Sequence, residues 1–277
     1  LGLINFNAVV DSLFASRLID PTLAPTAIDR AFRIYMLPQG MFSVAVATVL
    51  FPSLSRLAAR GDLDGFRERV GLGLRQIAFL LVPASVASAV LADPIVRLVY
   101  QRGQFGSGQT PVVAGALAAF ALGLTFNGAM LMLNRGFFSL QSPWVPTWIA
   151  LANLGLNAAL DAAFYRLGTW GIPLSTSLVN IAGTGLLLVL LRQRLGRIDF
   201  ARTASATVRI VVAAAGLAGV AYAVWWVVDD LLGRALWAQL LSVGTALAAG
   251  GASYLVSARL LGVRELDALL ALRRRAA

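Results

Sequence analysis

The sequence contains no cysteine and no histidine among its 277 residues. Disulfide frameworks, thiol chemistry, imidazole acid–base catalysis and the usual zinc sites are therefore excluded. Lysine is absent as well, so arginine supplies all 23 basic side chains. Charged residues make up only 13% of the chain, against 58% hydrophobic residues, which is too little polar surface for a soluble domain of this size. The composition predicts an integral membrane protein.

Long apolar runs account for most of the sequence. A bilayer core about 30 Å thick requires roughly 20 mostly apolar residues per helix. Eight segments meet this condition, at residues 1–18, 27–51, 70–92, 112–135, 143–165, 169–191, 208–228 and 235–259. We therefore predict an all-α integral membrane protein, a polytopic helical bundle of eight transmembrane helices over residues 1–277. The short turn at residues 168–171 predicts that the fifth and sixth segments form an antiparallel hairpin.

The arginines are distributed unevenly over the two sides of this topology. Sixteen fall in loops on one side and six on the other, with Arg33 inside a segment. Since cytoplasmic loops carry the excess of basic residues, we predict a cytoplasmic C-terminus. The net charge of +10 follows from this topology, so no nucleic-acid partner is expected. The loop at residues 53–70 has charges of both signs at helical spacing, which predicts an amphipathic helix on the cytoplasmic surface.

Arg33 lies inside an otherwise apolar segment. A charge at that depth costs at least ~2.5 kcal/mol on insertion scales, so it usually faces a bundle interior or a wet cavity. A guanidinium binds phosphate oxygens in pairs and stays charged at any relevant pH, which indicates an anionic substrate, with Arg30 as a weaker contact. The alternative for Arg33 is an ion pair with Asp29 at the outer interface, a position that Arg30 suits better. Pro38 and Gly40 weaken the helix and predict a bend.

A second set of polar residues occurs at membrane depth. Asn157 and Asp161 are four residues apart, so their oxygens share one helix face, while Asp11 and Thr176 lie in the first and sixth segments. Two carboxylates, an amide and a hydroxyl form the all-oxygen set that hard cations prefer. Na⁺ or a proton is the expected occupant, and Pro173 frees a carbonyl close by. Two alternatives stay open: Asp161 is solvated at its helix end, or it joins Asn157 in hydrogen bonds between helices.

Residues 33–56 read RIYMLPQGMFSVAVATVLFPSLSR and resemble the MurJ (MviN) family of lipid II flippases, in the MOP exporter superfamily. Further blocks of the family are matched by DSLFAS at residues 11–16, LVPA at 81–84, YQRGQF at 100–105 and RGFFSLQSP at 135–143. The last block departs from the usual acid and spacing at its end. Because the order and spacing of the blocks run through most of the chain, the resemblance is specific.

The resemblance implies an architecture and a set of site residues. Family members have fourteen spans in two lobes, so the segments here correspond to the seventh to the fourteenth, and an N-terminal lobe is expected ahead of Leu1. Arg33 falls among the arginines of the family's cationic central cavity, and the last two segments on a groove for the lipid tail. The family's sodium site falls on Asp11, Asn157, Asp161, Thr176 and the carbonyl of Ile172.

The resemblance implies a bacterial cytoplasmic-membrane flippase that carries lipid II, the lipid-linked peptidoglycan precursor, by alternating access. No cofactor is expected, and Na⁺ is a candidate coupling ion beside a proton. One alternative is a related exporter of another polyprenyl-linked glycolipid. Another is a non-transporting scaffold of cell-wall synthesis, in which Arg33 would be replaceable. An enzyme acting on polyprenyl phosphate is disfavoured, because the chain has no histidine, no cysteine and no acidic cluster beside its basic loops.

Overall fold

The computed structural model describes residues 10–103, 105–196 and 200–266, and its regular elements over these ranges are helices without strands. This confirms the predicted all-α class. The elements are η1 (Ala15–Ile19), α2 (Leu23–Pro38), η2 (Gln39–Ser43), α3 (Val44–Ala59), α4 (Leu63–Val90), α5 (Ala92–Tyr100), α6 (Thr110–Ser139), α7 (Trp144–Phe164), η3 (Tyr165–Leu167), α8 (Gly171–Leu195), α9 (Phe200–Leu232) and α10 (Leu236–Leu260).

Six stretches of the described chain are long and apolar enough to cross a membrane. They are Leu23–Ala59, Leu63–Val90, Thr110–Ser139, Gly171–Leu195, Arg202–Leu232 and Leu236–Leu260. Helix α7 has 21 residues, carries Asn153, Asn157 and Asp161, and is not among these six stretches. Half of the predicted first segment, at residues 1–18, lies outside the described residues. The multi-pass membrane architecture is therefore confirmed, whereas the predicted count of eight helices is not.

The predicted surface helix at residues 53–70 was wrong. Helix α3 continues to Ala59 and α4 already begins at Leu63. Only a tight turn separates them, in which Gly61 takes a φ of +69° and the Asp62 carboxylate accepts a hydrogen bond from the Gly65 amide at 2.9 Å as an N-cap. The charges that suggested a separate amphipathic element belong to the ends of two long helices.

Helices α2 and α3 form one continuous stretch with a weak point at the predicted place. Pro38 has no N–H to donate to the preceding turn, and the next five residues, Gln39–Ser43, form the π-helix η2. Such π segments inside a longer helix are frequent at functional sites. The region is held to α6 by Asn127, which donates to the Tyr35 hydroxyl at 2.7 Å and accepts from Gln39 at 3.4 Å.

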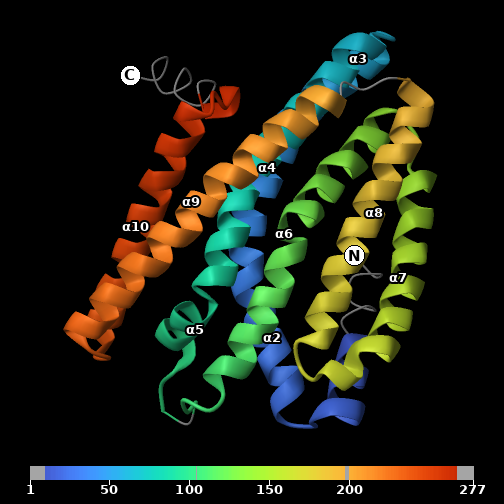
Figure 1. Ribbon diagram of the computed structural model, residues 1–277. Helices are drawn as coiled ribbons and strands as arrows, with labels where there is room; N and C mark the ends of the chain where they lie inside the picture. Colours follow the sequence, from blue (N-terminus) through green and yellow to red (C-terminus); the bar gives the residue numbers. More distant parts are fainter. Residues whose placement is uncertain (1–9, 104, 197–199, 267–277) are drawn as a thin grey trace.

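The bundle is organised around α4 and α6. Figure 1 shows the α7–α8 hairpin on one side of this pair and the α9–α10 hairpin on the other, and α6 contacts α8 while α4 contacts α9. A Cβ atom added at Gly123 of α6 would lie 2.7 Å from the Cα of Ser177 in α8. Small residues of this kind let membrane helices approach each other closely, and here they position α8 against the core.

The helix ends fall into two groups at opposite ends of the bundle (Figure 1). One end, which we call the arginine-rich end, contains the α3–α4 turn, the α6–α7 turn and the last turns of α8 and α10. It carries Arg60, Arg194 and Arg259, among others. The start of α2, helix α5 and the α7–α8 and α9–α10 turns lie at the other end. The loops thus alternate as the sequence predicted.

Candidate functional site

Arg33 lies well inside the stretch formed by α2 and α3. It comes ten positions after Leu23, the first residue of α2, which is about 15 Å along the helix axis. Its Nε donates to Asp29 Oδ2 at 2.8 Å, and the two side chains remain 71% and 58% exposed. An exposed ion pair one helical turn apart contributes little stability. The guanidinium therefore lies on an open face of the described helices.

The expectation that Arg30 would suit the position beside Asp29 better was wrong. Consecutive residues of a helix point in different directions, whereas residues four apart lie on the same face, so Arg33 meets Asp29. The guanidinium of Arg30 instead lies 4.6 Å from the ring centroid of Phe105 and 5.6 Å from that of Tyr100. The Tyr100 hydroxyl also donates to the Arg30 carbonyl at 3.2 Å. These cation–π contacts tie α2 to α5.

The face of α2 and α3 that carries Arg33 is uncovered within the described part of the chain. Its exposed large apolar residues are Phe32, Met36, Leu37, Met41, Val44 and Val49. Such a face suits lipid or another protein segment, but a charged pair at membrane depth is costly against lipid. The Arg33–Asp29 pair fits a water-containing cavity better than a lipid contact.

Three of the predicted ion ligands meet in one cluster. Asn157 and Asp161 lie on α7 with exposures of 1% and 0%. Asn157 Nδ2 donates to Asp11 Oδ1 at 2.7 Å and to Asp161 Oδ2 at 3.1 Å. We call these three residues the acid–amide cluster. Since Asp161 is fully buried, the alternative in which it is solvated does not hold.

The oxygen atoms of the acid–amide cluster favour a positively charged partner. Asp161 Oδ1 and Asn157 Oδ1 are buried without a hydrogen-bond partner in the described residues, which is costly for polar atoms. Two adjacent carboxylates also disfavour being charged together unless a cation or a shared proton joins them. Within the described ranges, no group of three or more acidic, histidine or cysteine side chains is placed to hold a metal ion. The oxygen set fits a monovalent cation or a proton.

Helix α8 contributes to this site less directly than predicted. The Thr176 hydroxyl donates to the Ile172 carbonyl at 3.4 Å, so these two predicted ligands contact each other. The hydroxyl that lies beside the Asp161 carboxyl group belongs to the buried Ser175, which also donates to the Gly171 carbonyl at 3.2 Å. Sequence reasoning missed Ser175, because the tight α7–α8 turn leaves the register of α8 open by about one residue.

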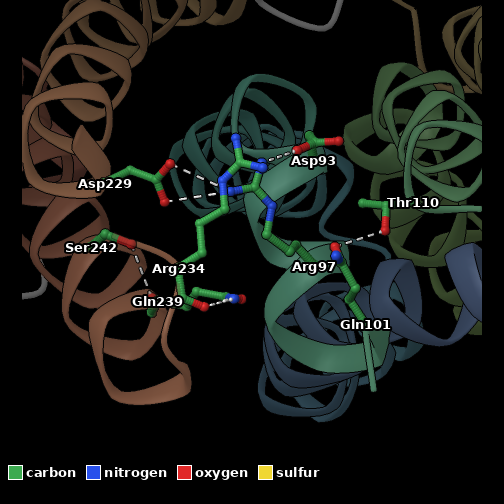
Figure 2. A network of polar contacts seen from close by, with 8 residues as sticks. All are labelled: Asp93, Arg97, Gln101, Thr110, Asp229, Arg234, Gln239 and Ser242. Carbon is green, nitrogen blue, oxygen red and sulfur yellow. Dashed lines mark hydrogen bonds and ion pairs between the residues drawn. The ribbon is translucent and has the colours of Figure 1, made fainter. Parts of the chain in front are cut away.

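A separate polar network joins α5 to α9. Arg97 Nη2 donates to Asp93 Oδ2 at 2.8 Å, and its Nη1 lies 3.4 Å from both carboxylate oxygens of Asp229. Figure 2 shows Arg97 between the two carboxylates. The side chains of Arg97 and Asp229 are 13% and 15% exposed. The network anchors the α9–α10 hairpin at the end opposite to the arginine-rich end.

The comparison with known proteins decides the family. The family model described as lipid II flippase MurJ matches residues 2–255. The chain belongs to the MurJ family. It is 29% identical over 266 residues to a probable lipid II flippase MurJ of Vibrio cholerae, covering 94% of this chain and 50% of that protein. It is 32% identical over 160 residues to the lipid II flippase MurJ of Thermosipho africanus, covering 57% and 32%.

The fold of this MurJ-family chain is also found in a solved structure. A lipid II flippase MurJ in an inward closed conformation superposes with a TM-score of 0.76 at 24% identity, covering 93% of this chain and 51% of that one. The chain thus spans between 32% and 51% of the length of these relatives. The solved structure thus shares the all-helical fold of the described residues.

Proposed function

We propose that the chain forms the second of two lobes of a flippase that carries lipid II, or a closely related undecaprenyl-linked glycolipid, across the bacterial cytoplasmic membrane. The observation that carries this proposal is the position of Arg33, a guanidinium exposed at membrane depth on an otherwise apolar face of a MurJ-family chain. The protein acts as a transporter and not as an enzyme. An N-terminal lobe completes the cavity.

In this proposal Arg33 receives the pyrophosphate of the headgroup. Its planar guanidinium forms paired, charge-assisted hydrogen bonds with phosphate oxygens. Asp29 holds the guanidinium in the absence of substrate, and the more highly charged pyrophosphate competes with that single carboxylate. Arg30 contributes less, because its guanidinium already lies against Tyr100 and Phe105. The polyprenyl tail remains in the lipid along α9 and α10.

In this proposal, the acid–amide cluster also binds the coupling ion. A sodium ion there would balance the charge of the two carboxylates. It would also contact the two oxygens that lack a hydrogen-bond partner, Asp161 Oδ1 and Asn157 Oδ1. Asp11 lies on the segment that leads through η1 into α2, the helix of Arg33, and Asn157 joins it to α7. A change at the cluster can therefore alter the position of α2. Ion binding drives transport only if the affinity differs between the two states of the protein.

The arginine-rich end faces the cytoplasm in this proposal, because short cytoplasmic loops carry the excess of arginine. The C-terminus then lies in the cytoplasm. The headgroup enters the cavity from that side, and rocking of the two lobes exposes it outside.

The test measures exposure of the lipid II headgroup outside cells depleted of their own flippase. The full-length protein should restore exposure in a sodium-dependent manner, and Asp161→Asn should reduce the sodium dependence several-fold, since it removes a charge from the acid–amide cluster. Asp230→Asn removes the same charge from an exposed position near the end of α9 and should leave the sodium response unchanged. No exposure with the unmodified protein rejects the function, while an unchanged sodium response in Asp161→Asn rejects the ion site alone.

A further inference from the structure

A cavity of about 330 Å³ lies at the arginine-rich end, between α4, the start of α9 and the turn after α10. Its charged lining consists of four arginines and one carboxylate: Arg75, Arg202, Arg209, Arg264 and Glu265. The volume lies near the lower limit for small-molecule sites. The cavity shares no residue with the Arg33 site or the acid–amide cluster.

The single carboxylate of the lining is already engaged. Arg75 Nε donates to Glu265 Oε1 at 2.9 Å, and the two side chains are only 10% and 6% exposed. Arg75 Nη1 also lies 3.5 Å from the Thr203 hydroxyl. This buried pair lines the cavity, so Glu265 already has Arg75 as its cationic partner. Arg264 is exposed.

The turn after α10 lines the cavity and is held in place by contacts with neighbouring helices. Gly262 takes a φ of +65°, and Arg209 Nη1 donates to the carbonyls of Leu261 and Gly262 at 3.3 and 3.5 Å. Arg209 thus places a positive charge at the C-terminal end of α10, where the helix dipole favours a cation. Val263 and Leu266 are buried in a cluster with residues of α4 and α9. The position of Arg264 between them is therefore fixed by packing on both sides.

We propose that this cavity binds a phosphate-bearing anion, namely the phosphodiester headgroup of an anionic membrane lipid. Arginine is the side chain best matched to phosphate oxygens, and the arginines outnumber the carboxylates of the lining. The cavity lies at the end of α9 and α10, whose outer faces expose apolar residues such as Val212 and Val256. The acyl chains of a lipid can follow these faces while its phosphate occupies the cavity. The bound lipid stabilises the packing of the α9–α10 hairpin on α4.

The test measures the binding of dioctanoyl phosphatidylglycerol to the purified full-length protein in a neutral detergent. Dioctanoyl phosphatidylcholine and inorganic phosphate serve as comparison ligands. Arg264→Gln should weaken phosphatidylglycerol binding about tenfold or more, the loss expected for one charge-assisted hydrogen bond. Arg259→Gln is the matched control, since Arg259 is exposed at the same end of the bundle but does not line the cavity. It should bind like the unmodified protein.

The outcomes separate the sources of the phosphate group. Inorganic phosphate that binds as tightly as phosphatidylglycerol, and is lost in Arg264→Gln, supports the site and assigns it to a free phosphate compound. Unchanged phosphatidylglycerol binding in Arg264→Gln overturns the proposal. Equal weakening in both variants also overturns it, because general attraction to the basic surface then explains the binding. The melting temperature of each ligand-free variant, expected to match that of the unmodified protein, shows that the fold is retained.

Discussion

Arg33→Ala in the full-length protein is expected to abolish growth of a strain depleted of its own lipid II flippase. Two charge-assisted hydrogen bonds to the pyrophosphate are lost, which lowers headgroup affinity by about a hundredfold or more. The remaining cavity has no substitute on α2, because Arg30 is held by Tyr100 and Phe105. Growth on the unmodified gene is the reference, and the amount of variant in the membrane fraction shows that insertion is intact.

Asp29→Asn separates substrate binding from a purely structural role of Arg33. This change breaks the ion pair with Arg33 but leaves the guanidinium in place, so growth should continue. If Arg33 served only to pair with Asp29, both variants would fail alike. Normal growth with Arg33→Ala would instead support the non-transporting scaffold.

Glu265→Ala is expected to destabilise the protein by about 3–5 kcal/mol, the range for removing one partner of a buried ion pair. The change leaves the guanidinium of Arg75, which is 10% exposed, without its carboxylate. The same pair joins α4 to the turn after α10 across 190 positions of sequence, so its loss also loosens the α9–α10 hairpin. Thermal or chemical unfolding of the purified protein in detergent measures the effect.

Asp64→Ala provides the matched control for this prediction. Asp64 pairs with Arg67, but its side chain is 90% exposed, and exposed pairs contribute at most about 1 kcal/mol. A loss of stability in Asp64→Ala as large as that in Glu265→Ala would contradict the role assigned to burial.

The hydrophobic pattern predicted the fold class and most of the helices, because a membrane span can be recognised from the apolar residues of its own segment. The errors occurred where that signal is weakest. Charges on both sides of Gly61 resembled a surface helix, although they belong to the ends of α3 and α4. Helix α5 was missed, since its nine residues are too short to stand out in a search for spans of about 20 residues.

In the candidate site, too, contacts along one helix could be predicted more readily than contacts between distant segments. The spacing of Asn157 and Asp161 predicted their shared face, because the helical period determines it. Ser175 was missed because a turn intervenes. The Arg75–Glu265 pair, and the cavity beside it, depend on how α4 and the end of α10 meet in space. No local pattern of the sequence encodes that contact.

The most direct test of the account is the accessibility of position 33 to water. The chain has no cysteine, so Arg33→Cys can be labelled selectively in a full-length protein whose other segments also lack cysteine. We predict rapid reaction with a membrane-impermeant thiol reagent in intact membranes, while Ala31→Cys, at a position that is 0% exposed, should not react. Reaction of Arg33→Cys only with a membrane-soluble reagent would place this side chain against lipid and contradict the account.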